Sequence, residues 1–179
     1  DASLNAVRLE DIVGAMPAGA IWHAQACCSA GSEGDSKYHD LLEPGDVLAI
    51  IDRVAALGPS VAPAATAVLG RPAPVRAVVG HVEPTFDWTL RDEHTGQGLG
   101  AQLVEALSTN LFGGQPIGLA LEPYRSGVGV LNSQWHDVRD MLNDGETWVR
   151  PALTRLRLTA IDRQSLVLLG DPTVTLPKL

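Results

Sequence analysis

Three short apolar runs, spaced widely along the chain, restrict the folds open to this sequence. They are 20–28 (AIWHAQACC), 75–82 (VRAVVGHV) and 165–172 (SLVLLGDP). Each is too short for a buried helix and has few polar residues, which is typical of strands covered on both faces. Segments with helical spacing of apolar residues separate the runs. The sequence therefore predicts an α/β fold with a mostly parallel sheet flanked by helices.

The expected helices lie between and around these strands. Helical periodicity marks the segments 7–17, 43–57, 101–112, 118–143 and 145–162, and a short helix is expected within 58–74. Proline and glycine interrupt helices, so we expect the helix in 118–143 to bend or break near Pro123 and the Gly127/Gly129 pair.

Bulk composition excludes several classes of function. The 179 residues match the size of one domain, and the net charge of -8 argues against binding to a phosphate backbone. The longest uncharged stretch, 54–70, contains Gly58, Pro59 and Pro63, so it cannot span a membrane. We therefore expect no nucleic-acid partner, no membrane segment, and a protein or peptide as the molecule that is bound.

Cys27 and Cys28 are the only cysteines. Sequence neighbours cannot build a disulfide framework, which predicts a reducing compartment, the cytoplasm. Cys27 is expected at the carboxyl end of the first strand, where open α/β sheets bind ligands, and backbone amides of the small-residue turn after it can hold an oxyanion. Cys27 is therefore a candidate nucleophile, the alternative being a buried cysteine that only packs.

Three segments resemble one family. Gln25-Ala26-Cys27 resembles the Gln-Ala-Cys of caspases, and 26–30 (ACCSA) resembles the Ala-Cys-x-(Ser/Thr)-Ala signature of CHAT domains, their bacterial caspase-like relatives. The segment VRAVVGHVEPTFDW resembles the strand after the catalytic one. The segment IDRQSLVLLGDPTVTLP resembles the last strand and Gly-Asp-Pro turn shared with gingipain-type peptidases. The landmarks occur in family order within 7–176.

The resemblance implies a cysteine endopeptidase in which the Cys27 thiolate attacks a peptide carbonyl and forms an acyl-enzyme that water hydrolyses. It implies that 1–179 is a single caspase-like domain, the carboxyl-terminal part of the fold. On a continuous strand Cys28 would point away from Cys27. In an alternative register Cys28-Ser29-Ala30-Gly31 resembles the Cys-x-x-Gly of separase, which would make Cys28 the nucleophile.

The catalytic histidine is where this sequence departs from the family. The family's histidine follows the strand before the nucleophile strand, and only a helix precedes that strand here. We therefore expect the base on an upstream segment of the same polypeptide. His23 is four residues before Cys27, more than ~12 Å away along a strand. Of the others, His39, His81, His94 and His136, His81 is the best substitute because it ends the neighbouring strand.

Candidate substrate contacts come from the strand end and from two loops. Gln25 matches the caspase glutamine that lines the pocket for the residue before the scissile bond. Loop acids would suit a Lys or Arg side chain, and Trp88 could form an apolar wall. Solvated acids on an acidic chain are the simpler reading. The candidates are Gln25, Asp35, Glu83, Asp87 and Trp88.

Two other functions stay open. One is a catalytically inactive caspase-like module that acts in protein-protein interaction. The other is a small-molecule α/β hydrolase, for which no serine nucleophile elbow is visible. The stretch GQGLG (96–100) lacks the spacing of a phosphate loop, and Asp171 belongs to an ordinary Gly-Asp-Pro turn. We expect no cofactor and no metal.

Overall fold

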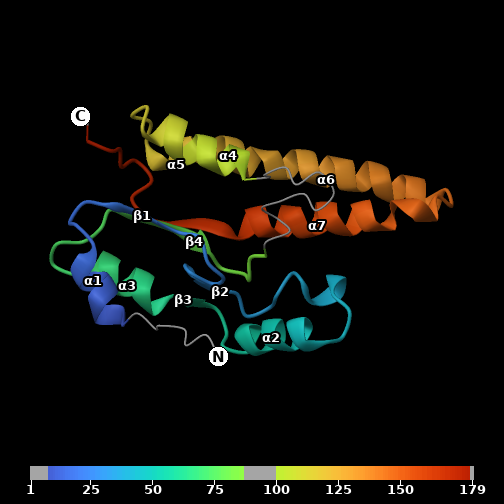
Figure 1. Ribbon diagram of the computed structural model, residues 1–179, viewed down its shortest axis with the longest axis horizontal. Helices are drawn as coiled ribbons and strands as arrows, with labels where there is room; N and C mark the ends of the chain where they lie inside the picture. Colours follow the sequence, from blue (N-terminus) through green and yellow to red (C-terminus); the bar gives the residue numbers. More distant parts are fainter. Residues whose placement is uncertain (1–7, 87–99, 178–179) are drawn as a thin grey trace, which may run out of the picture.

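The computed structural model describes residues 8–86 and 100–177 and shows a mixed α/β fold (Figure 1). Helices make up about 54% of the described residues, so the sheet is the smaller part of the structure. The prediction of an α/β class is confirmed. No helix within the two described ranges is long and apolar enough to cross a membrane.

The predicted elements occur in the predicted order, most of them with shorter bounds; the short strands β2 and β3 were not predicted, and the last helix extends beyond its predicted end to Ser165. The first half contains α1 (Leu9–Ala15), β1 (Ile21–Ala24), β2 (Gly31–Ser32), a 3-10 turn (His39–Leu41), α2 (Asp46–Ala55), β3 (Ser60–Val61), α3 (Pro63–Gly70) and β4 (Ala77–His81). The second half contains α4 (Ala101–Val104), which continues as a π-helical segment (Glu105–Leu111), then α5 (Ile117–Ala120), α6 (Glu122–Asn143), a 3-10 turn (Thr147–Val149), α7 (Arg150–Ser165) and β5 (Leu166–Gly170).

The main sheet has the strand order β1-β4-β5. β1 and β4 are parallel, with Ile21 opposite Ala77, whereas β5 is antiparallel to β4, with Leu166 opposite His81. The prediction of a mostly parallel sheet is therefore wrong for the last strand. The reason is that α7 runs into β5 without a loop, so the chain enters the sheet at the end where β4 leaves it. β2 and β3 form a separate antiparallel pair.

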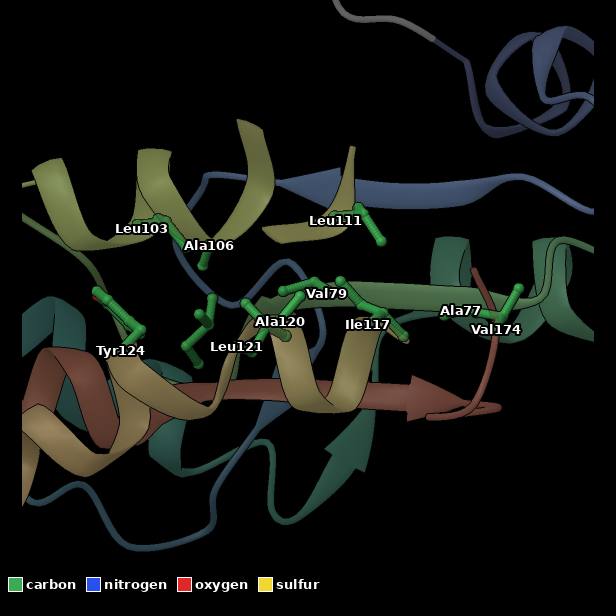
Figure 2. Close-up of a cluster of buried hydrophobic side chains, with 11 residues drawn as sticks. Ala77, Val79, Leu103, Ala106, Leu111, Ile117, Ala120, Leu121, Tyr124 and Val174 are labelled. Carbon is green, nitrogen blue, oxygen red and sulfur yellow. The ribbon is translucent and has the colours of Figure 1, made fainter. Parts of the chain in front are cut away.

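Helices cover both faces of the main sheet (Figure 1). On one face, α4, the π-helical segment, α5 and the start of α6 pack on β4; Figure 2 shows Leu103, Ala106 and Leu121 gathered around Val79. On the other face, α1 and α3 pack on the strand residues that point to that side, Trp22, Val78 and Leu169. A third cluster joins α7 to α2 and to the loop that contains Tyr38. Burying each aliphatic side chain of these clusters stabilises the fold by about 1.5–3 kcal/mol.

The expected interruption in 118–143 occurs at one position only. The chain breaks between α5 and α6 at Leu121, just before Pro123, because proline fits the first turn of a new helix. Gly127 and Gly129 lie inside α6 and do not interrupt it. Gly127 instead leaves room for the side chains of Arg163 and Gln102, which would approach an added Cβ to 2.8 and 3.1 Å.

Candidate functional site

β1 ends at Ala24, and not at Cys27 as predicted. The segment that contains the two cysteines is therefore a turn beyond the strand. The amide of Ala26 donates to the carbonyl of Ala24 (3.1 Å), and that of Ser29 donates to the carbonyl of Ala26 (3.3 Å). Cys28 has a φ of +52°, in the left-handed region that favours glycine. The strand alternation expected to separate the two thiols therefore does not apply.

The turn packs against the end of β4 and the residues after it. The Ala30 amide donates to the His81 carbonyl (2.9 Å), and the Cys28 amide donates to the Glu83 carbonyl (3.2 Å). Residues 28–30 therefore run antiparallel to 81–83. The close approach depends on Gly80, since a Cβ there would lie 2.6 Å from the Ser29 Oγ and 3.1 Å from the Ala30 amide nitrogen.

Ser29 connects the turn to both parallel strands. Its hydroxyl donates to the carbonyl of Ala24 on β1 (2.7 Å) and accepts from the amide of His81 on β4 (3.0 Å). No role of its own was predicted for Ser29 from the sequence. Its signal was the hydroxyl-bearing position of the ACCSA motif, which here serves to hold the turn.

Cys27 is exposed, and its sulfur contacts the main chain of Thr85. The thiol donates to the Thr85 carbonyl (3.3 Å), and the Thr85 amide donates to the sulfur (3.4 Å). The pair of contacts fixes the direction of the side chain across the turn. Cys27 thus lies beyond the carboxyl ends of the parallel strands β1 and β4, the edge at which open α/β sheets bind ligands.

Comparisons with protein-family models, with curated proteins and with solved structures found no match to this chain.

Cys28 differs from its neighbour in both burial and chemistry. Its side chain is only partly exposed, and burial, with the nearby Cys27 thiol and Glu83 carboxylate, raises the pKa of Cys28 to about 11. Because the thiolate is the nucleophilic form of cysteine, Cys28 is a weak nucleophile near neutral pH. This argues against the separase-like register.

The amides expected to form an oxyanion hole are largely engaged in hydrogen bonds within the turn. Those of Cys28, Ser29, Ala30 and Gly31 all donate to carbonyls. Among residues 27–31, the amide of Cys27 is the one without an acceptor in the described part of the chain. The expectation that the turn after Cys27 supplies several oxyanion donors is therefore not met in this conformation.

His81, the best candidate for a substitute base, is fully buried and bonded away from the thiol. Its Nδ1 lies 3.0 Å from the Ser165 Oγ, which donates to the Asp162 carbonyl (2.7 Å), so Nδ1 carries the proton and donates. Burial lowers the pKa of His81, although Asp162 opposes this effect. His81 is therefore a neutral core histidine. Ser165 and Asp162 lie far from His81 in sequence, so no local pattern could have revealed this cluster.

The other histidines also lie away from Cys27. His23 is partly buried on β1, and burial, with His81 nearby, lowers its pKa. His39 is exposed beside Asp40 and Asp52, and His136 packs against Trp135 on α6. His94 lies outside the described residues. No histidine among the described residues makes a hydrogen bond to Cys27.

The candidate substrate contacts have different environments. Gln25 is exposed next to the turn, and its side chain bonds to His23. Asp35 is exposed on the loop after β2, whereas Glu33 on the same loop forms an ion pair with Lys37 (3.2 Å). Asp87 and Trp88 lie outside the described residues. Gln25 and Asp35 thus remain accessible to a bound peptide.

Glu83 does not face solvent. It is 2% exposed, its Oε2 accepts from the Ser36 hydroxyl (2.8 Å), and its Oε1 accepts from the Lys37 amide (2.9 Å). Both carboxylate oxygens are therefore occupied within the protein, and the carboxylate is not available to a substrate in this structure.

The described residues contain no group of three or more His, Cys, Asp or Glu side chains arranged to hold a metal ion. The polar side chains around Cys27 instead contact one another and the main chain. This arrangement offers the chemistry of a thiol on the exposed residue Cys27, beyond the carboxyl ends of two parallel strands.

Proposed function

We propose that this chain is the carboxyl-terminal part of a caspase-like, CHAT-type cysteine endopeptidase with Cys27 as its nucleophile. The observation that carries the proposal is the exposed Cys27 thiol, held by Thr85 beyond the carboxyl ends of two parallel strands. The resemblance of the ACCSA segment to the family signature supports it. Because both cysteines are free, we place the protein in a reducing compartment, the cytoplasm.

The reaction follows from thiol chemistry. The Cys27 proton passes to a base, the sulfur attacks the carbonyl carbon of a peptide bond, and a carbon-sulfur bond forms. The base then returns the proton to the leaving amine as the carbon-nitrogen bond breaks. Water attacks the acyl-enzyme and releases the carboxylic acid and the thiol. The amide of Cys27, which has no acceptor in the described part of the chain, is the donor that we propose for the oxyanion of each step.

The base must come from outside the described residues, and the sheet has an edge that can receive it. β1 is an edge strand. The carbonyl of Ala20 faces β4, where it accepts from the amide of Arg76 (2.8 Å). Backbone groups alternate in direction along a strand, so those of Ile21 and His23 face the open edge. We propose that a strand from an upstream segment pairs there and ends beside Cys27 with the catalytic histidine.

The substrate is a protein or peptide, and a basic side chain suits the loops best. Asp35 is exposed, and the chain carries a net charge of -8. Gln25, adjacent to the turn, is placed to contact the residue before the scissile bond. These contacts are part of the proposal and need the same tests as Cys27.

The experiment is cleavage of peptide libraries by the full-length polypeptide. The Cys27→Ala variant should lose cleavage completely while its circular dichroism remains native, and Cys28→Ala should keep most of the activity. Equal loss in both variants, or full activity without Cys27, would overturn the assignment.

A second candidate, an inactive caspase-like interaction module, is favoured by one observation. His23, which is partly buried, and His81, which is fully buried, both have lowered pKa values, and neither bonds to Cys27. If the full-length polypeptide neither cleaves peptides nor reacts with a peptide electrophile, the interaction module becomes the better assignment.

A further inference from the structure

Glu83 joins the two segments that surround Cys27. Its backbone carbonyl accepts from the Cys28 amide (3.2 Å), which holds the turn. Its side chain reaches the other way and binds the loop that follows β2, through Ser36 and Lys37. Glu83 therefore contacts both the turn that carries Cys27 and the loop 33–38, which we call the acidic loop.

The loop is folded around the Glu83 carboxylate. The Ser36 hydroxyl donates to Oε2 and accepts from the Tyr38 amide (3.3 Å), so the next residue is fixed as well. Tyr38 is completely buried and packs edge-on against Phe86, with 5.4 Å between ring centroids. The polar contacts and the aromatic contact thus anchor residues 36–38 to the segment after β4.

The charge of Glu83 is held by neutral donors. Lys37 gives Glu83 its backbone amide, while its ammonium group pairs with Glu33. No cation pairs with Glu83 in the described part of the chain. Replacing Glu83 by glutamine should therefore cost more binding energy in this network than the same change at an exposed glutamate. A glutamine side chain has one oxygen and one NH2 group, so it cannot accept from both the Lys37 amide and the Ser36 hydroxyl.

We propose that Glu83 is a positioning residue: it sets the acidic loop 33–38 at a fixed place relative to the Cys27 turn, so that both contact the same bound peptide. The inference rests on the proposed function, because it assigns Glu83 to the peptide site of that peptidase. It replaces direct substrate binding by Glu83 with an action through the loop. Asp35, which directly precedes Ser36, one of the two partners of the carboxylate, is the side chain whose position Glu83 controls.

The test compares two electrophiles on the full-length polypeptide carrying Cys28→Ala, and mass spectrometry of its fragments follows the modification of Cys27 alone. Iodoacetamide is small and needs no loop. A peptidyl chloromethyl ketone with lysine before the reactive carbon must also bind to the acidic loop. In its reaction with Cys27, the sulfur displaces chloride as a carbon-sulfur bond forms. In Glu83→Gln, we expect the half-saturating concentration of the peptide probe to rise about tenfold. The rate with iodoacetamide should change less than about twofold.

Three further variants keep the result interpretable. Ser36→Ala should also raise the half-saturating concentration of the peptide probe. In the double variant, the two substitutions should raise it by less than the product of their separate effects, since both residues belong to one hydrogen-bond network. Glu43→Gln, an exposed acid ahead of α2, is the matched control and should behave like the parent. If Glu83→Gln is not folded by circular dichroism, Ser36→Ala, which keeps the carboxylate, decides the question.

Loop position is also measured without any reaction at Cys27. Trypsin should cleave after Lys37 about tenfold faster in Glu83→Gln than in Glu43→Gln, because the loop loses its anchor. Parent-like trypsin cleavage and parent-like response to the peptide probe in folded Glu83→Gln would overturn the inference. A parent protein that reacts with iodoacetamide but not with the peptide probe would instead overturn the proposed function.

Discussion

Gly80 controls how closely the turn that carries Cys27 approaches β4. A side chain at this position would meet the Ser29 Oγ at 2.6 Å and the Ala30 amide nitrogen at 3.1 Å, both closer than a Cβ normally comes. The turn would have to move away from the strand and stretch the hydrogen bonds that Ser29 and Ala30 make to His81. The placement of the thiol therefore depends on a residue that carries no functional group.

Gly80→Ala should lower the free energy of unfolding by about 1–3 kcal/mol through this overpacking. The control is Gly129→Ala on α6, where an added Cβ meets nothing within 4 Å and helix propensity gains about 0.5–1 kcal/mol. Urea unfolding of the two variants measures the difference. If Gly80→Ala were as stable as Gly129→Ala, the close packing of turn and strand would be contradicted.

His23, which is partly buried, and His81, which is fully buried, make stability depend on pH in a defined window. His23 and His81 have pKa values lowered from 6.5, mainly by burial, so the unfolded chain binds protons more readily than the folded one. Asp162 and Gln25 oppose the shift but do not reverse it. Well above pH 6.5 these histidines are neutral in both states, and their effect on the free energy of unfolding vanishes.

We therefore expect the free energy of unfolding to fall as pH drops from about 6.5 toward 5, with a limit of about 1.4 kcal/mol per pH unit for each proton taken up. His23→Gln should reduce this slope, because one of the two groups is removed. His136→Gln, on the exposed surface of α6, serves as the control. A pH profile unchanged by His23→Gln would contradict the sign or the site of the effect.

At the scale of elements, α7 connects the helical layer to the sheet. It packs along α6, as Figure 1 shows, and continues without a loop into β5. Leu158 and Ile161 on α7 also pack against Tyr38 and Ile51, so this helix supports the loop that Glu83 holds. Loss of packing on α7 should therefore affect both the core and the site.

Ile161→Ala should cost about 2–5 kcal/mol, since it leaves a cavity beside Tyr38 in a fully buried cluster. Val130→Ala on α6 is the control, because Val130 is 59% exposed and should change stability by less than about 0.5 kcal/mol. Thermal and urea unfolding check both values. Equal stability of the two variants would mean that the cluster around Tyr38 is not packed as described.

Sequence periodicity predicted the elements well but not their directions. The helical and strand segments were identified because apolar spacing is a local property. The antiparallel β5 was missed because strand direction depends on where α7 ends in space. The early end of β1 was missed because AIWHAQACC stays apolar through Cys28, while hydrogen bonds to Ala24 and Ala26 turn the chain before it. Those bonds form between backbone groups, which the side-chain pattern does not describe.

The site was predictable only in part, for a similar reason. Cys27 was singled out from its neighbours in sequence, and the structure leaves its thiol exposed. Glu83 was expected to face a substrate, but it is buried by Ser36 and Lys37, which are 47 and 46 residues away in the chain. Loop acids resemble one another in sequence, and only the tertiary contacts separate Asp35 from Glu83.

At the scale of the whole molecule, β1 lies at the edge of the sheet formed by the described residues, and we propose that this edge receives the upstream segment of the enzyme. A strand added there would pair with the backbone of Ile21 and His23. The amides of these two residues should exchange rapidly with solvent deuterium in the chain 1–179. They should become protected in a longer polypeptide that carries the upstream histidine segment.

The amide of Val79, at the centre of the sheet, should be protected in both proteins and is the internal control. If the amides of Ile21 and His23 exchanged as rapidly in the longer polypeptide as in the chain 1–179, the upstream segment would not pair with β1. The base would then have to reach Cys27 by another route.

The identity of the nucleophile can be determined by locating the residue that reacts with a peptide electrophile. The full-length polypeptide is treated with a lysine-containing peptidyl chloromethyl ketone near neutral pH, and the modified residue is located by mass spectrometry of its fragments. We expect stoichiometric labelling of Cys27, little labelling of Cys28, whose pKa is raised to about 11, and loss of labelling on denaturation. Preferential labelling of Cys28, or equal labelling of both thiols in folded and unfolded protein, would contradict it.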